Sequence, residues 1–147
     1  MTSEADLGPR LSRRLAYLLK RAMVDLDTLH EQHLRPFGIT ARELAVLLFL
    51  DGREPESQQQ AAAHLGVDRT TMVGLLDALE GKDLVARRPD VEDRRRNVIV
   101  LTDTGQATLR KAMRASDAAE RQLLAELDDR EAAQLRELLK RVTSGRA

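Results

Sequence analysis

Two short segments of this chain carry arginine and threonine side chains at spacings suited to contact with double-stranded DNA. In the first segment, Arg69, Thr70 and Thr71 follow Asp68, which is a good N-cap for a helix. Arginine can pair with the edge of guanine, and threonine can meet a phosphate or a thymine methyl group. The second segment is the turn Asp93–Arg96. An arginine at the tip of such a turn can enter the minor groove, where negative potential is concentrated.

The elements around the first segment have the spacing of a helix-turn-helix. Ser57–Gln60 forms a capping box that opens a short helix, which closes at Gly66. Three residues then separate it from a second helix, whose apolar face consists of Met72, Leu75, Leu76 and Leu79. At about 100° per residue, the opposite face presents Thr70, Gly74 and Asp77. Because Gly74 has no side chain, we expect the helix backbone to approach the floor of a groove closely there.

Two β-rich runs follow this helix and frame the arginine-rich turn. Residues 84–88 and 97–101 predict a hairpin, with Arg94, Arg95 and Arg96 in its turn and Asp93 able to hold one of them. The like charges of these arginines repel one another unless an anion is nearby. The order of elements therefore predicts a mainly α protein with a small β-hairpin wing. Two plainer interpretations remain open: a helix hairpin with solvated polar residues, and a solvated charged turn.

Long amphipathic helices are predicted on both sides of this core. The first runs from about residue 10 to 33, and a second begins at the capping box Thr40–Glu43. After the hairpin, Thr102 can cap a helix over about 103–126, and Asp128 can open a last one. The chain has too little else to cover the apolar faces of the terminal helices, so we expect a homodimer.

The composition restricts the class of protein. The 147 residues include no cysteine, which excludes a disulfide framework, a thiolate zinc site and a thiol redox switch. No apolar run approaches the roughly 18 residues of a membrane span. The segment Met1–Pro9 lacks the pattern of a signal peptide, so we expect a cytoplasmic protein. An enzyme is not expected, because the chain has no cysteine, only three histidines, no Gly-rich phosphate loop and no paired carboxylates in an apolar setting.

The net charge of zero argues mildly against a strong nucleic-acid binder, but its distribution is uneven. The turn from Arg87 to Arg96 has five arginines against Asp90, Glu92 and Asp93. A basic edge on a neutral body favours a specific binder with modest non-specific affinity.

Several of these motifs together resemble the multiple antibiotic resistance regulator (MarR) family. Residues 67–80, followed by Gly81–Val85, are similar to the family's recognition helix and first wing strand. Asp93-Arg94-Arg95 fits its Asp-x-Arg wing motif, and Leu101-Thr102-x-x-Gly105 fits the pattern that closes the wing. The resemblance covers nearly the whole chain. One departure is Asp83, at the turn into the wing, where many members have glycine.

The resemblance implies a homodimeric winged helix-turn-helix repressor that binds a pseudo-palindromic operator. It implies a helical dimerisation domain of residues 10–35 and 103–143, and a DNA-binding domain of residues 36–102. In that scheme Asp93 orients Arg95 for the minor groove. The implied DNA contacts are Ser57, Gln58 and Gln59 to phosphate, Arg69, Thr70, Thr71 and Gly74 in the major groove, and Arg94, Arg95 and Arg96 in the wing.

The resemblance also implies a small-molecule effector, often an aromatic or phenolic acid, and no cofactor. The candidate pocket residues by position are Tyr17, Arg21, His33 and Arg42, with His30 nearby. Tyr17 as a core or interface aromatic, and the two histidines as ordinary helix-end residues, remain open. His30 and His33 alone do not make a metal site, because a third ligand is missing. The absent cysteine rules out the peroxide-sensing branch, and the absent tryptophan disfavours the urate-binding branch.

Two other classes remain as alternatives. A winged-helix protein-interaction module would place residues 66–101 against a protein, and its binding would depend only weakly on salt. A plain helical dimerisation scaffold would leave the arginine-rich turn unexplained.

Overall fold

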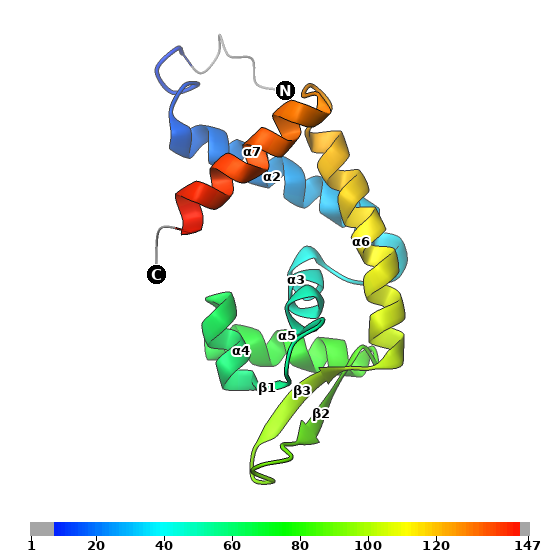
Figure 1. Ribbon diagram of the computed structural model, residues 1–147. Helices are drawn as coiled ribbons and strands as arrows, with labels where there is room; N and C mark the ends of the chain where they lie inside the picture. Colours follow the sequence, from blue (N-terminus) through cyan, green and yellow to red (C-terminus); the bar gives the residue numbers. More distant parts are fainter. Residues whose placement is uncertain (1–7, 145–147) are drawn as a thin grey trace. The chain divides into compact units, whose positions relative to one another are not determined.

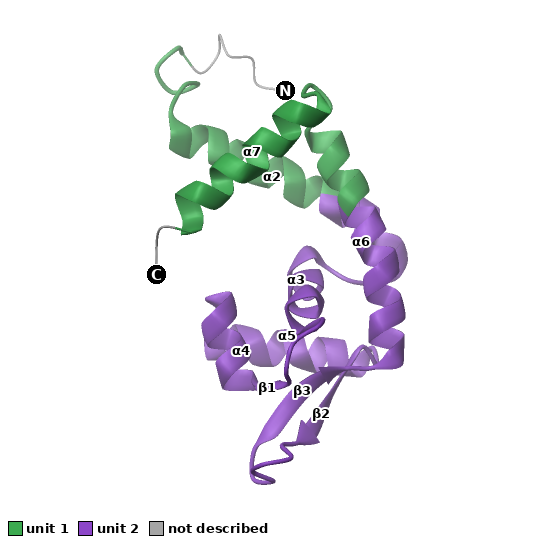
Figure 2. Cartoon of the chain, viewed as in Figure 1, with its two compact units in different colours: residues 1–29, 117–147 green, residues 30–116 purple. Residues whose placement is uncertain are grey.

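The computed structural model describes residues 8–144, which form seven helices of three or more residues and three strands (Figure 1). The first seven residues, on which the expected lack of a signal peptide mainly rests, lie outside the described residues. The chain divides into two compact units, residues 1–29 with 117–147 and residues 30–116, called unit 1 and unit 2 (Figure 2). The elements in chain order are α2 (Leu15–Leu34), η1 (Arg35–Phe37), α3 (Ala41–Leu50), β1 (Glu56–Ser57), α4 (Gln58–Leu65), α5 (Arg69–Gly81), β2 (Val85–Pro89), β3 (Asn97–Leu101), α6 (Asp103–Leu123) and α7 (Asp129–Ser144).

Unit 2 is a winged helix, which confirms the predicted fold class. Its antiparallel sheet has the strand order β1-β3-β2. Val85 pairs with Leu101 and Pro89 with Asn97, so β2 and β3 form the predicted hairpin, with β2 starting one residue late. The third strand, β1, was not predicted from the sequence; its two residues Glu56 and Ser57 pair with Ile99 and Val98. A two-residue strand has no alternating pattern of its own, because its pairing with β3 alone defines it.

Local capping interactions fix where the helices of unit 2 begin. Thr40 and Ser57 each form the predicted capping box, with Glu43 and Gln60 as their partners. Asp68 caps α5 through the backbone N–H of Thr71 at 2.7 Å. Between α4 and α5, Gly66 has a φ of 67°, a left-handed conformation that glycine adopts without steric cost. The helix-turn-helix therefore has the predicted boundaries.

One continuous apolar core holds the helices of unit 2 onto its sheet. The largest fully buried side chains come from α2, α3, α5 and β3: Leu34, Val46, Leu47, Met72, Leu76, Leu79 and Ile99. Three of these belong to the α5 face predicted to be apolar. Burial of this face orients α5 so that its opposite face is exposed.

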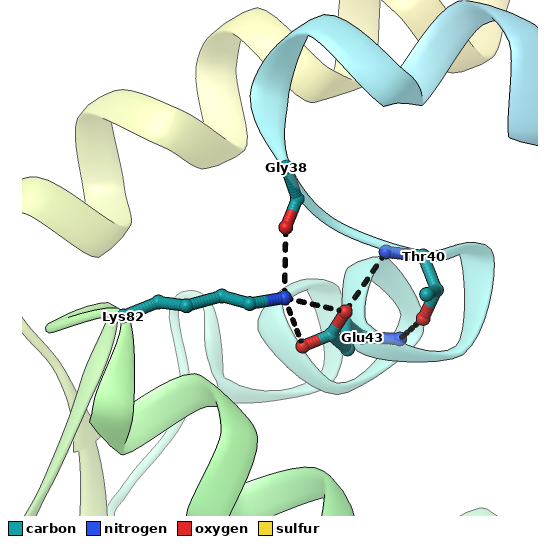
Figure 3. A network of polar contacts seen from close by, with 4 residues as sticks. All are labelled: Gly38, Thr40, Glu43 and Lys82. Atoms are coloured by element: carbon teal, nitrogen blue, oxygen red, sulfur yellow. Dashed lines mark hydrogen bonds and ion pairs between the residues drawn. The ribbon is translucent and has the colours of Figure 1, made fainter.

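A buried carboxylate links the start of α3 to the end of α5 (Figure 3). Glu43 has a side chain only 4% exposed, and its ion pair with Lys82 measures 2.9 Å. Lys82 also donates to the carbonyl oxygen of Gly38 at 2.7 Å, and the backbone N–H of Thr40 donates to Glu43 at 2.9 Å. The charge of Glu43 is thus compensated where water has little access.

The wing is attached to α6 by a close backbone contact. Gly105 lies so near Leu84 that a Cβ built on it would overlap the Leu84 carbonyl oxygen. Thr102 caps α6 by accepting from the backbone N–H of Gly105 at 2.9 Å. Asp83, at the predicted departure from the family pattern, has a φ of 60°. This left-handed conformation explains why glycine suits that position, and aspartate tolerates it better than most residues do.

Unit 1 contains the outer parts of α2 and α6 together with α7. The described chain forms hydrogen-bonded turns after Gly8 and Pro9, and regular helix starts only at Leu15 rather than near residue 10. Likewise α6 ends at Leu123, earlier than the predicted 126, before the capping box of Asp128 and Glu131. Many large apolar side chains of unit 1 are exposed: Leu11, Leu15, Leu18, Leu19, Met23, Val24, Leu127, Leu135, Leu138, Leu139 and Val142. No described helix is long and apolar enough to cross a membrane.

Candidate nucleic-acid interface

The start of α4, the start of α5 and the wing surround one open hollow of about 630 Å³ in unit 2. We call it the arginine-lined hollow. Its lining residues are Ser57, Gln58, Gln59, Ala62, Arg69, Met72, Arg87, Arg95, Arg96, Asn97 and Ile99. Six of these are predicted contact residues, and they come from three elements separated in sequence. Thr70, Thr71, Gly74 and Arg94 do not line it.

The first turn of α4 forms one edge of the hollow. Ser57 accepts from the backbone N–H of Gln60 at 3.2 Å, and the Gln60 side chain accepts from the Ser57 N–H at 3.0 Å. The first N–H groups of a helix have no acceptor within it and favour an anion. Gln59 is exposed, whereas the side chain of Gln58 already accepts from Arg87 at 3.3 Å.

The exposed face of α5 begins with Arg69 and Thr70. Gly74 lies about one turn further along α5, and the space beside it is empty, since a Cβ built there would have no atom within 4 Å. Thr71, the third residue predicted to contact DNA here, is half-buried and its hydroxyl donates to Asp68 at 2.9 Å. The hydrogen bonds from the Thr71 backbone and hydroxyl hold the pKa of Asp68 below its ordinary value. Thr71 therefore stabilises the start of α5.

The wing turn is shaped by backbone hydrogen bonds and leaves its arginines exposed. The N–H of Asp90 donates to the Arg96 carbonyl oxygen at 2.8 Å, and the Arg96 N–H donates to that of Asp93 at 3.0 Å. The Asp93 carboxylate accepts from the backbone N–H of Arg95 at 3.1 Å. Asp93, predicted to support the wing, thus holds Arg95 through its backbone N–H. Arg94, Arg95 and Arg96 are all exposed.

Arg87 lines the hollow, and its contacts were not predicted from the sequence. It counted toward the basic edge, but its guanidinium donates to Glu80 at 2.8 Å and to Asp77 at 2.9 Å. The hydrogen bond to Asp77 is the main cause that raises the pKa of Arg87 above its ordinary value. No local signal identifies these partners, because Asp77 and Gln58 lie 10 and 29 residues away in sequence.

The geometry of unit 2 agrees with comparisons to known proteins. The model of the MarR family matches residues 37–96. A structure of the transcriptional repressor CouR bound to a 23-mer DNA duplex is 31% identical, covers 97% of this chain and 98% of that chain, and has a TM-score of 0.83. This chain belongs to the MarR family. Members of the MarR family are transcriptional regulators and not enzymes, which agrees with the class predicted from the sequence.

Two further MarR-like relatives are informative. CouR from Rhodococcus jostii RHA1, in a structure with p-coumaroyl-CoA, is 30% identical over 92% of this chain and 95% of that chain, with a TM-score of 0.78. The HTH-type transcriptional repressor NicR of Pseudomonas putida KT2440 is 27% identical over 99 residues, which are 67% of this chain. The match spans 63% of the length of NicR.

The residues that the MarR resemblance offers for an effector are divided between the two units. In unit 1, Tyr17 is half-buried and Arg21 pairs with Asp25 at 3.6 Å. In unit 2, Arg42 lines a second hollow of about 340 Å³ with Thr71 and Leu75. His33 is half-buried, and the ring of His30 forms a hydrogen bond with Ser116 at 2.9 Å. Among residues 8–144, no three His, Cys, Asp or Glu side chains are placed to hold a metal ion.

Proposed function

We propose that this chain is a homodimeric, cytoplasmic MarR-family repressor that binds a pseudo-palindromic operator and is released from it by a small molecule. The observation that carries the proposal is the arginine-lined hollow. It brings together Ser57, Gln59, Arg69, Arg95 and Arg96 from three elements. Clustered guanidinium groups at an open surface attract the phosphates of a DNA backbone.

Each element has its own part in the proposed complex. The exposed face of α5, with Arg69, Thr70 and Gly74, enters the major groove, and Thr71 supports it from the cap. Ser57, Gln58 and Gln59 face phosphate at the start of α4. The wing arginines Arg94, Arg95 and Arg96 lie along the minor groove and its phosphates, with Arg95 inserted. Asp93 fixes the backbone at Arg95 and so directs its side chain.

The homodimer is proposed from the apolar surface of unit 1. Several leucines and valines on α2 and α7 are exposed, and extended exposed apolar surface is typical of an interaction site. Residues 10–35 and 103–143 would form the dimerisation domain, and residues 36–102 the DNA-binding domain. Two-fold symmetry then predicts half-sites about 34–36 Å apart, or one turn of DNA.

The proposed effector is an aromatic acid or a derivative of one. This choice is supported by the structure of the similar protein CouR, which is bound to p-coumaroyl-CoA. The candidate residues are Tyr17, Arg21, His33 and Arg42. An effector weakens DNA binding only if it prefers the conformation that misaligns the two α5 helices of the dimer. No cofactor or metal is part of the proposal.

Replacement of single arginines tests the proposal. Arg95→Ala should weaken binding to most DNA sequences and leave the dimer intact. Arg69→Ala should relax base preference at one position of each half-site, at a cost of about 1–3 kcal/mol. The matched control is Arg110→Ala, which removes an exposed arginine of α6 that does not line the hollow.

Fluorescence anisotropy on operator and random DNA measures both effects. Wild-type affinity in Arg95→Ala would contradict the wing assignment. A uniform loss over all sequences in Arg69→Ala would make Arg69 a phosphate contact. If the wild-type protein binds no DNA even at low salt, residues 66–101 are better explained as a protein-interaction surface.

A further inference from the structure

Arg87 differs from the other arginines of the arginine-lined hollow in the partners that it already has. Its side chain is 24% exposed and forms ion pairs with Asp77 at 2.9 Å and Glu80 at 2.8 Å. It also donates to Gln58 at 3.3 Å. By contrast, Arg94, Arg95 and Arg96 are exposed.

The three contacts of Arg87 connect the three elements that form the hollow. Arg87 lies on β2 of the wing, Asp77 and Glu80 lie on α5, and Gln58 lies in the first turn of α4. A planar guanidinium can serve three acceptors at once because its N–H groups form a rigid fork. Movement of the wing relative to α5 would break at least one of these bonds.

The two carboxylates have an additional effect on the charge of the exposed α5 face. Asp77 shares that face with Thr70 and Gly74, and its side chain is 61% exposed. An uncompensated carboxylate there would repel DNA phosphate. The ion pair with Arg87 reduces this repulsion, and at the same time it occupies the guanidinium.

We propose that Arg87 is a positioning residue of the DNA-binding surface: it joins α4, α5 and the wing in the geometry that fits an operator, and it does not itself bind phosphate. This inference rests on the proposed function. It assigns opposite roles to neighbouring arginines, because Arg95 contacts DNA whereas Arg87 arranges the residues that do.

Removal of the two carboxylates distinguishes a positioning role of Arg87 from a purely electrostatic effect on DNA affinity. Asp77→Ala/Glu80→Ala adds two units of positive charge per protomer and frees Arg87. Electrostatics alone predicts tighter binding. The positioning role predicts instead that operator affinity falls by about tenfold, the loss expected for one charge-assisted hydrogen bond, while affinity for random DNA does not fall. A merely destabilising effect would lower both affinities in proportion.

Two further variants complete the test. Arg87→Lys keeps the charge but cannot serve three acceptors, so it should lose operator affinity nearly as fully as Arg87→Ala; a phosphate contact would tolerate lysine. The charge control is Glu92→Ala, since the Glu92 side chain has no hydrogen bond or ion pair among residues 8–144. It should not weaken operator binding.

The experiment uses the full-length protein, an operator selected by the wild type from a random DNA pool, and anisotropy at two salt concentrations. Weaker, less selective binding by the double variant and by Arg87→Lys would support the positioning role. Unchanged or tighter operator binding by the double variant, or wild-type affinity in Arg87→Lys, would overturn it and leave the proposed function standing. Failure of the wild type to enrich any sequence would overturn the proposed function and this inference with it.

Discussion

The two units of the chain differ in how far each encloses its own apolar side chains. In unit 2, leucine, valine, methionine and isoleucine side chains from α2, α3, α5, β2, β3 and α6 form a continuous buried core. In the described part of unit 1, only Ala119 is buried, and most of its large apolar residues are exposed. Unit 2 therefore has a core of its own, whereas the helices of unit 1 leave apolar faces exposed, and these are the faces proposed to form the dimer.

This difference indicates that DNA binding and the association of two chains depend on different residues, the first on unit 2 and the second on unit 1. Substitutions in unit 2 should affect the folding or the DNA binding of each protomer without changing how two chains associate. Substitutions on the apolar faces of unit 1 should act on the association of two chains, and on DNA binding only through it.

The largest expected effect comes from a charge on the apolar surface of unit 1. Leu138→Asp should convert the proposed homodimer to a monomer of 16.5 kDa, because a carboxylate in a protein interface is costly to bury. Loss of bivalent contact should then weaken binding to a two-half-site operator by about 10²–10⁴-fold. Light scattering gives the mass, and anisotropy gives the affinity.

The matched control for this variant is in unit 2. Val91→Asp makes a comparable change at an apolar wing residue that is 96% exposed, and it should leave the mass unchanged. A dimeric Leu138→Asp protein, or a monomeric Val91→Asp protein, would contradict the assignment of unit 1 to dimerisation.

Removal of the partner of the buried carboxylate should destabilise unit 2. Lys82→Met leaves Glu43 buried without its cation, at an expected cost of about 2–3 kcal/mol in the free energy of unfolding. The control is Arg35→Met, which breaks an ion pair whose side chains are 73% and 75% exposed and should cost under about 1 kcal/mol. Urea unfolding measures both. Equal losses of unfolding free energy in the two variants would mean that burial of Glu43 does not make its ion pair more stabilising than an exposed one.

A methyl group at Gly105 should also destabilise unit 2. The new Cβ would overlap the Leu84 carbonyl oxygen, so that α6 and the wing must move apart. The expected loss of unfolding free energy is about 1–3 kcal/mol. The same urea titration tests this expectation, and a wild-type midpoint for Gly105→Ala would show that the contact is not tight in solution.

Gly74→Ala makes the same chemical change on the exposed face of α5 and should have the opposite effect on stability. With no atom within 4 Å of the new Cβ, alanine should stabilise the helix by about 0.5–1 kcal/mol. Operator affinity should nevertheless fall, by about tenfold, because the methyl group holds the backbone away from the bases. If anisotropy gives the same operator affinity for Gly74→Ala and the wild type, Gly74 does not lie at the DNA interface.

The smallest expected effect concerns the cap of α5. Because the folded state holds the pKa of Asp68 below its ordinary value of 3.8, the cap stabilises the protein above that value and is lost as pH falls through the lowered one. Asp68→Asn keeps a capping side chain that does not titrate. In thermal melts from about pH 6 to 3, the melting temperature of the wild type relative to that of Asp68→Asn should therefore decrease as pH falls. A pH-independent difference between the proteins would contradict this.

The features that sequence predicted well depend on neighbouring residues. The caps at Thr40, Ser57 and Asp68 each involve a partner three residues away, so a short motif identifies them. The apolar face of α5 follows from helical periodicity, and the wing hairpin follows from two β-rich runs joined by a turn.

The features that sequence missed depend on residues far apart in the chain. Strand β1 exists only through its pairing with β3, about 40 residues later. The Glu43–Lys82 ion pair joins residues 39 apart, and the Arg87 contacts reach as far as 29. Arg87 thus appeared as one more basic residue of the turn, because its charge is visible in the sequence and its partners are not.

The most direct test of sequence-specific DNA binding is anisotropy of the purified protein on the DNA upstream of its own gene, at two salt concentrations and with random DNA as competitor. A sequence-specific regulator should bind tightly, weaken steeply with salt and resist the competitor. Binding that random DNA displaces equally well, or no binding at low salt, would contradict a sequence-specific regulator.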